Sequence, residues 1–216
     1  MHFHIITLFP GAFDSYLGES ILKRAIEDKK IRVSFYNPRD FADNSYKRID
    51  RPPYAGGPGM VIQAEPVIKA IAKAKSKAKS RSVKIIFLSP SGKQFTNEYA
   101  AKTSKKFKDV IIVSGRYEGI DARVKKVFKM EDISIGPFVL TGGELPAMLM
   151  IDVMARQVEG VLGDINSLEE SRIASPDVYT RPEVFTYKGK SYRVPKVLLC
   201  GNHAAIELWK TKRRGQ

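Results

Sequence analysis

Cysteine is almost absent from this chain, because Cys200 is the only one among 216 residues. A single cysteine excludes an internal disulfide and a zinc site built from cysteines. It follows the apolar residues Val197, Leu198 and Leu199, so we expect a buried, structural thiol. The shortage of cysteine also favours a reducing, cytoplasmic setting.

Long apolar runs are missing too, and none reaches the ~18 residues that a membrane-spanning helix needs. The first ten residues, MHFHIITLFP, have no basic segment before their apolar run and no small-residue cleavage pattern. They therefore predict a first strand and no signal peptide, and the chain as a whole predicts no membrane partner.

Histidine is scarce, with three residues in the chain. His2 and His4 stand two apart in the predicted first strand and His203 is distant, so a metal-binding spacing is absent. We therefore predict no metal ligands. No serine lies in a nucleophile-elbow pattern, and His203 is expected to begin a helix, with no part as a base.

Acidic residues are few beside basic ones: 23 Asp and Glu against 37 Lys and Arg, a formal net charge of +14. A basic surface neutralises phosphates, which makes a nucleic acid the leading candidate partner. A lysine-rich protein without such a partner would have the same composition. The charge runs Lys73–Arg81 and Lys105–Lys108 are typical of solvated helix faces.

Strand patterns alternate with helix patterns along most of the chain, which predicts an α/β fold with a mainly parallel sheet. The predicted strands are Phe3–Phe9, Ile31–Tyr36, Val83–Leu88, Val110–Ser114, Ile133–Ile135 and Phe138–Leu140. The predicted helices are Glu19–Lys29 with Ser20 as its cap, Glu65–Ser80, Thr96–Phe107 with Thr96 as its cap, Gly119–Phe128 and Glu144–Val158.

The composition changes after Gly163, which predicts three parts: a main domain over 1–163, a polar linker over 164–177 and a small C-terminal appendage over 178–216. Within the appendage, Tyr187–Tyr192 predicts a hairpin turn. Asn202 is placed to cap a last basic helix that ends at Arg214.

Three loops that follow predicted strands contain glycine: Ser89–Gly92, Gly115–Gly119 and the stretch from Ser134 to Gly143. In a parallel sheet, ligands bind outside the carboxyl ends of the strands, and glycine lets the backbone approach a ligand closely. Tight turns alone would need the same residues, but three such loops together favour a cofactor held largely by backbone groups. They lack the lysine of a phosphate-binding loop and the spaced glycines of a dinucleotide fold.

A fourth glycine-rich segment, Tyr54 to Met60, contains Gly56, Gly57 and Gly59 and follows several basic residues. A flexible, cationic loop of this kind is suited to close over a substrate. A disordered connection would look similar in the sequence.

Taken together and in order, these motifs resemble the bacterial tRNA (guanine-N1)-methyltransferase family TrmD, of the SPOUT class. The matching segments are ITLFP (Ile6–Pro10), PRDF (Pro38–Phe41), RPPYAGGPGM (Arg51–Met60), LSPSG (Leu88–Gly92), GRYEGIDARV (Gly115–Val124), SIGPFVLTGGELPAM (Ser134–Met148), GVLG (Gly160–Gly163), YTRPEV (Tyr179–Val184) and LLCGNHAAI (Leu198–Ile206). The ordered set spans nearly the whole chain, so the resemblance is specific.

The resemblance implies a SPOUT fold with a deep trefoil knot, a homodimer with shared active sites and S-adenosyl-L-methionine as the methyl donor. It also implies a tRNA substrate, methylated on the guanosine 3′ of the anticodon (position 37), and a dependence on magnesium. The residues that it assigns to the cofactor are Leu88, Ser89, Pro90, Gly115, Tyr117, Glu118, Ser134, Ile135, Gly136, Pro137, Phe138, Val139, Leu140, Gly142, Gly143 and Pro146.

Two catalytic roles follow from the chemistry of this reaction. Guanine N1 carries a proton at neutral pH, so a general base must remove it. Negative charge then develops toward O6, where an arginine can stabilise it. Arg156, in the segment MARQV, matches the catalytic arginine of the family.

The general base is less clear, because the acidic run after GVLG contains no aspartate at the matching place. Glu170 is the predicted base if the run is one residue shorter, and Glu169 and Asp177 are the other nearby carboxylates. The chain also ends soon after Trp209, whereas members of the family usually continue, which predicts weaker binding of tRNA than in those members. An RNA-binding protein that keeps the cofactor pocket but not catalysis therefore remains the alternative.

Overall fold

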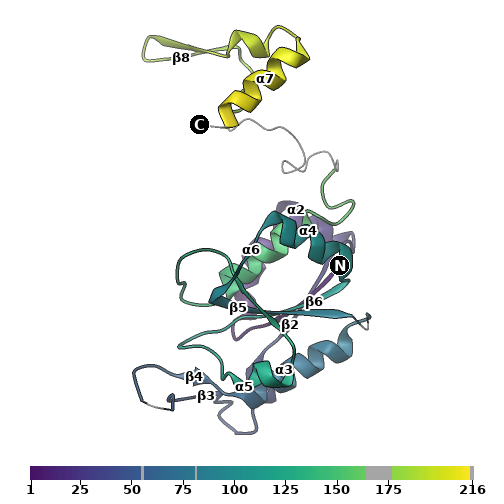
Figure 1. The fold of residues 1–216 in the computed structure, drawn as a ribbon, viewed down its shortest axis with the longest axis vertical. Coiled ribbons are helices and arrows are strands. Elements are labelled where there is room, and N and C mark those ends of the chain that lie inside the picture. Colours follow the sequence, from purple (N-terminus) through teal and green to yellow (C-terminus); the bar gives the residue numbers. More distant parts are fainter. Residues whose placement is uncertain (55, 81, 164–176, 215–216) are drawn as a thin grey trace. The chain divides into compact units, whose positions relative to one another are not determined.

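The structure is a computed structural model that describes residues 1–54, 56–80, 82–163 and 177–214 (Figure 1). The chain divides into two compact units, Met1–Gly163 and Asp164–Gln216, which are described separately below. No helix in the described ranges is long and apolar enough to cross a membrane.

A five-stranded parallel sheet forms the centre of the first unit, as the alternation of elements predicts. Its order is β2–β1–β6–β5–β7, with β1 at His2–Ile6, β2 at Arg32–Tyr36, β5 at Val83–Gln94, β6 at Asp109–Val113 and β7 at Glu131–Ser134. All five residues of β6 are buried. This burial on both faces explains the uninterrupted apolar run from Val110 to Val113.

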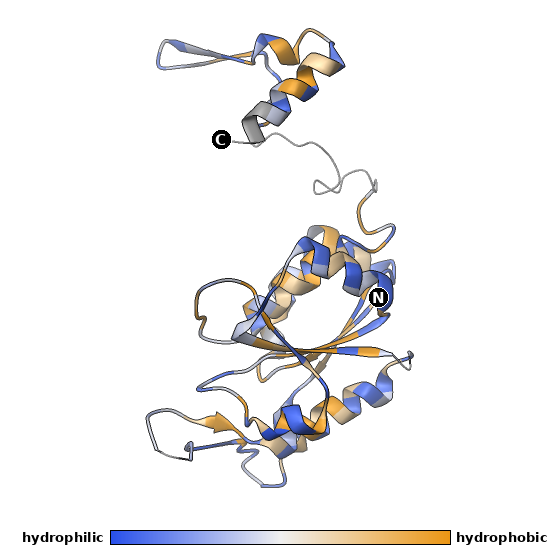
Figure 2. Cartoon of the chain, viewed as in Figure 1, coloured by the Kyte–Doolittle hydropathy of each residue, from blue (hydrophilic) through white to orange (hydrophobic). Residues whose placement is uncertain are grey.

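Helices cover both faces of the sheet (Figure 1). One face packs against α1 (Asp14–Leu17), α2 (Ser20–Glu27), α4 (Asn97–Lys106) and α6 (Glu144–Ala155), and the other against α3 (Ala64–Lys77) and α5 (Arg123–Val127). Side chains alternate between the two cores along β1: Phe3 and Ile5 face the α6 side and Ile6 the α3 side. Hydrophobic and hydrophilic residues alternate along α3 (Figure 2), whose apolar stripe packs on the sheet.

The shorter elements surround this core. They are the 3₁₀ helices η1 (Pro10–Phe13) and η2 (Pro38–Phe41) and the two-stranded ladder of β3 (Asp50–Arg51) and β4 (Val61–Ile62).

Strand β5 contains a four-residue insertion relative to its neighbour. Both Leu88 and Lys93 of β5 pair with Ile133 of β7, so residues 89–92 bulge out of the ladder between them. A Cβ atom on Gly92 would lie 2.5 Å from the backbone nitrogen of Ile133, so no side chain fits there. The bulge brings Ser89 and Pro90 to the edge of the sheet where the strands end.

Several predicted elements differ in the structure. Phe138–Leu140 is not a strand: its side chains are exposed and the segment lies outside the sheet. Ser20 is the first residue of α2 and its φ is +49°, while Glu19 occupies the cap position. Helix α5 begins at Arg123, four residues after Gly119. Thr96 does cap α4, accepting a hydrogen bond from the Tyr99 amide at 3.1 Å.

The second unit is a hairpin followed by a helix. Strands β8 (Val184–Tyr187) and β9 (Lys190–Arg193) pair antiparallel, with Lys188 and Gly189 both at positive φ in the predicted turn. A short 3₁₀ helix, η5 (Lys196–Leu198), leads to α7 (His203–Arg214). Asn202 caps α7 as predicted, because its side chain accepts a hydrogen bond from the Ala205 amide at 3.1 Å.

The prediction of a buried thiol at Cys200 is wrong. Cys200 is exposed, and its thiol lies 3.1 Å from the carbonyl oxygen of Val197. The apolar neighbours of Cys200 belong to a small unit, and small units have little interior in which to bury a side chain.

Candidate functional site

A pocket of about 300 Å³ lies where β5, β6 and β7 end. This volume is at the lower end of the range for small-molecule sites, ~300–1,000 Å³. The residues that line it are Leu88, Ser89, Pro90, Gly115, Arg116, Tyr117, Glu118, Gly119, Ile133, Ser134, Ile135, Phe138, Val139, Leu140, Thr141, Gly142, Gly143 and Pro146. Three loops far apart in the sequence thus form one cavity, because parallel strands end at the same edge of the sheet.

Of the residues predicted to hold the cofactor, Gly136 and Pro137 are the two that do not line this pocket. Gly136 instead shapes the turn that leaves β7. The Ser134 hydroxyl donates to the Gly136 carbonyl oxygen at 2.9 Å and accepts from the Gly136 amide at 3.2 Å. A Cβ atom on Gly136 would lie 2.2 Å from the Phe138 ring, so only glycine lets that ring reach its place on the pocket wall.

Gly143 is required by the packing of the protein itself. Its amide donates to the Gly115 carbonyl oxygen at 2.9 Å, and its carbonyl oxygen accepts from the Ser114 hydroxyl at 3.2 Å. A Cβ atom on Gly143 would lie 2.7 Å from the Cα atom of Ser114. The loops after β6 and β7 are therefore in direct backbone contact.

Gly142 and Gly115 have different surroundings. A Cβ atom on Gly142 would meet the Arg116 side chain at 2.3 Å, so this glycine makes room for an arginine. A Cβ atom on Gly115 would meet only Ile120, at an ordinary 3.7 Å. The packing of the protein thus does not require glycine at position 115, whereas close approach of a ligand to the backbone would.

Arg116 was not among the predicted site residues, and it forms a partly buried ion pair with Glu144. Its Nε atom donates to Oε2 of Glu144 at 2.9 Å, and the Thr7 hydroxyl donates to Oε1 at 2.8 Å. The guanidinium lies over the Phe9 ring at 4.7 Å from the centroid and donates to the Thr141 carbonyl oxygen at 3.3 Å. The segment after β1 is therefore joined to both pocket loops through one carboxylate.

The position of Glu144 suits a charged group. It is 3% exposed and lies in the first turn of α6, where the helix dipole favours a negative charge. A buried charge is tolerated when it is paired and hydrogen-bonded, and here both carboxylate oxygens have donors. In the sequence, the position of Glu144 directly after two glycines was a sign of a special role. The spacing of residues did not reveal its partners, Thr7 and Arg116.

The predicted substrate loop joins the pocket rim at its C-terminal end. The Glu118 amide donates to the Met60 carbonyl oxygen at 3.0 Å, and a Cβ atom on Gly59 would lie 2.5 Å from the Glu118 carboxylate. Gly56, Gly57 and Gly59 all have positive φ, which glycine adopts readily. Tyr54 at the other end of the loop is 97% exposed.

Arg156, one of the two predicted catalytic residues, lies away from the pocket of its own chain. Arg156 caps the C-terminal end of α6, whereas the pocket lies at the N-terminal end of that helix. Twelve helical residues separate the two ends, or about 18 Å at 1.5 Å per residue. Glu170 and Glu169 lie outside the described residues, and Asp177 is exposed.

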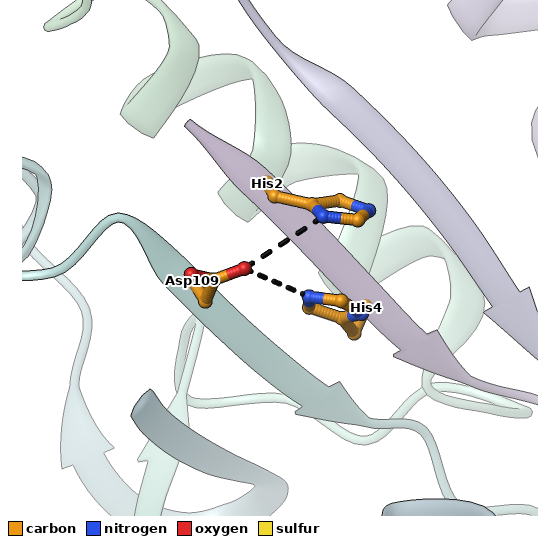
Figure 3. Close-up of side chains that lie close together, drawn as sticks. All are labelled: His2, His4 and Asp109. Atoms are coloured by element: carbon orange, nitrogen blue, oxygen red, sulfur yellow. Dashed lines mark hydrogen bonds and ion pairs between the residues drawn. The ribbon is translucent and has the colours of Figure 1, made fainter. Parts of the chain in front are cut away.

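A separate group of side chains lies at the opposite edge of the sheet, where β1 and β6 begin. His2 and His4 both face Asp109 there (Figure 3). The spacing of the histidines gave no metal motif because the third group is more than a hundred residues away in the sequence.

Comparison with known proteins identifies the family to which this chain belongs. The family profile described as tRNA (Guanine-1)-methyltransferase TrmD matches residues 1–216. A protein of Campylobacter jejuni subsp. doylei is 44% identical over 215 residues, which is 98% of this chain and 91% of that protein. One of Caldanaerobacter subterraneus subsp. tengcongensis is 46% identical over 217 residues (99% and 86%), and one of Clostridioides difficile 42% over 214 residues (97% and 90%). All three are named tRNA (guanine-N(1)-)-methyltransferase.

Proposed function

Because the chain belongs to the TrmD family of tRNA (guanine-1)-methyltransferases, we propose that it methylates N1 of the guanosine 3′ of the anticodon, position 37, in tRNA. The methyl donor is S-adenosyl-L-methionine. The observation that carries the proposal is the pocket at the ends of β5, β6 and β7, lined by residues of three family motifs.

The pocket residues fit this donor. Leu88 and Ile135, both partly exposed, offer apolar surface for a purine ring, and the absence of a side chain at Gly115 permits hydrogen bonds between the ligand and the backbone. S-adenosyl-L-methionine supplies a methyl group on a sulfonium, so the protein acts chiefly by holding donor and acceptor in line.

We assign the proton and charge steps to two side chains. The Glu170 carboxylate accepts the proton from guanine N1, which frees an electron pair to form the new bond to the methyl carbon as the carbon–sulfur bond breaks. Arg156 donates hydrogen bonds to O6 of the guanine, where negative charge develops.

Magnesium, which the family resemblance implies, is suited to carboxylate oxygens and water. Of the described pocket residues, Glu118 offers an exposed carboxylate for it.

The place of Arg156 supports a homodimer with shared sites. Pro146 of α6 lines the pocket and Arg156 follows it by about 15 Å along the helix, so we infer that the arginine serves the pocket of the partner subunit. An apolar surface for such a contact is present: Leu145 and Leu149 of α6 and Phe138, Val139 and Leu140 of the neighbouring loop are all exposed. Exposed apolar side chains gathered in this way mark interaction surfaces.

The remaining parts of the proposal concern the path of the chain and its partner. We propose that the chain forms the deep trefoil knot of the SPOUT class. The backbone bridge between Arg116, which precedes β7 in the sequence, and Gly142, which follows it, agrees with this proposal. We also propose that the net charge of +14 and the C-terminal unit serve tRNA binding, and that the protein acts in the cytoplasm.

Methyl transfer from labelled S-adenosyl-L-methionine to unmodified tRNA transcripts tests the function. We expect transfer to transcripts with guanine at position 37 and none to matched transcripts with adenine there. Binding of both cofactor and tRNA without any transfer would instead identify an RNA-binding protein that has lost catalysis.

A further inference from the structure

Three side chains with metal-binding atoms converge on the α3 face of the sheet, at the edge where the strands begin (Figure 3). His2 and His4 share a face of β1, and the parallel register places His2 opposite Asp109 of β6. One ring nitrogen of each histidine and a carboxylate oxygen of Asp109 all lie within 4.8 Å of one another. We propose that these three residues bind a divalent metal ion such as Zn²⁺.

The distances between the atoms agree with a shared metal. Oδ1 of Asp109 lies 3.1 Å from Nε2 of His4 and 3.7 Å from Nδ1 of His2. Ligand atoms on a tetrahedral zinc, at bond lengths of ~2.0–2.2 Å, stand about 3.3 Å apart. The 3.7 Å separation is beyond a hydrogen bond, so Asp109 is hydrogen-bonded to His4 and faces His2 without a hydrogen bond.

The outer atoms of all three ligands are already held by the protein. Nε2 of His2 lies 2.9 Å from the Ser34 hydroxyl, and Nδ1 of His4 lies 3.0 Å from the Tyr36 hydroxyl. Oδ2 of Asp109 accepts a hydrogen bond from the Ser80 amide at 3.0 Å. Hydrogen bonds of this kind fix the ring orientation and tautomer of metal-binding histidines. Each histidine therefore presents its remaining nitrogen to the common centre.

The chemistry of the donor atoms also points to one class of metal ion. Two imidazoles and one carboxylate favour zinc over magnesium, which prefers oxygen ligands.

This site is separate from the cofactor pocket, which lies at the opposite edge of the sheet. A metal there would tie the N-terminal strand β1 to β6 in the middle of the sheet. Its role is therefore structural, with water completing the coordination, and the proposal does not depend on the methylation reaction.

Metal titration of the full chain tests the site. The protein is made without a histidine tag, stripped with a chelator and titrated with Co²⁺, whose visible absorption reports nitrogen coordination, and then with Zn²⁺. We compare wild type with His2→Ala, which removes one partly exposed ligand, and with the matched control His203→Ala, the remaining histidine of the chain. Ser34→Ala, which leaves all ligands in place, is a milder second variant.

We expect one equivalent of metal in wild type and in His203→Ala, with a melting temperature that rises with Zn²⁺ concentration. His2→Ala should lose both effects, and Ser34→Ala should bind about 10- to 100-fold more weakly. Wild type without stoichiometric binding, or equal binding in His2→Ala, would mean that the three side chains form only a hydrogen-bonded network. If His2→Ala does not fold, unchanged affinity in Ser34→Ala would equally overturn the proposal.

Discussion

Nε of Arg116 lies 2.9 Å from Oε2 of Glu144, and this ion pair joins the loop after β6 to the first turn of α6. The carboxylate is buried, whereas the arginine side chain is 28% exposed and lies against Phe9. The shape of the pocket therefore depends on a charge that sits behind the loops, hydrogen-bonded to Thr7 as well.

The first prediction concerns this charge. Glu144→Gln keeps the size of the side chain but leaves Arg116 without its counter-charge, so we expect a loss of about 1–3 kcal/mol in the free energy of unfolding. S-adenosyl-L-methionine should bind roughly ten-fold more weakly, equivalent to about 1.4 kcal/mol. Denaturant unfolding and calorimetry measure the two effects. Glu98→Gln, which removes an exposed carboxylate paired with Lys102 on α4, is the control and should change neither.

The second prediction separates two glycines of the pocket. Gly143→Ala should destabilise the fold, because the new methyl group would collide with the Ser114 backbone at 2.7 Å. Gly115→Ala should leave the melting temperature unchanged, because its methyl group meets only Ile120 at 3.7 Å, yet it should weaken cofactor binding by filling the space meant for the ligand. Normal affinity in a stable Gly115→Ala protein would show that the ligand does not approach this backbone.

Mixed dimers test whether the sites are shared. Arg156→Ala and Gly115→Val should each be inactive alone, the first through loss of the arginine and the second through loss of cofactor binding. Co-expressed, half of the dimers are mixed and each mixed dimer has one intact site, so about a quarter of the wild-type rate should return. If both parents are inactive and the mixture is as inactive as they are, Arg156 acts within its own chain; an active Arg156→Ala parent would show that the arginine has no catalytic part.

The fourth prediction concerns the general base. Glu170→Gln should leave cofactor binding intact and reduce the methylation rate about 100-fold or more, the scale expected for loss of a positioned base. Asp177→Asn is the matched control and should keep the rate. The reverse pattern would assign the base to Asp177.

Salt dependence tests the role of the net charge. Binding of tRNA should weaken steeply as salt increases, with the logarithm of the affinity falling linearly with the logarithm of the salt concentration. Filter binding or fluorescence anisotropy over a range of KCl concentrations measures the slope. A flat response would mean that the charge of +14 is unrelated to tRNA.

The sequence by itself determined the class of fold and the family. Apolar, β-branched runs mark buried strands because both sheet faces are covered, so β6 was predictable within one residue, whereas β5 extends to Gln94, six residues past its predicted end. The glycine-bearing loops after β5, β6 and β7 were predictable as one site, since parallel strands end at one edge. Caps such as Thr96 and Asn202 were predictable because they act over three residues.

Only the tertiary structure decided which distant side chains meet. The pairing of Arg116 with Glu144 and the convergence of His2 and His4 on Asp109 depend on the order and register of strands, which periodicity within one segment does not record. Local apolar character misled at Phe138–Leu140 and at Cys200, because burial depends on what packs against a segment and not only on its own composition. The position of Arg156 was likewise decided by the tertiary structure. Its motif suggested a role at the pocket, but α6 places it at the end of the helix that is far from the pocket of the same chain.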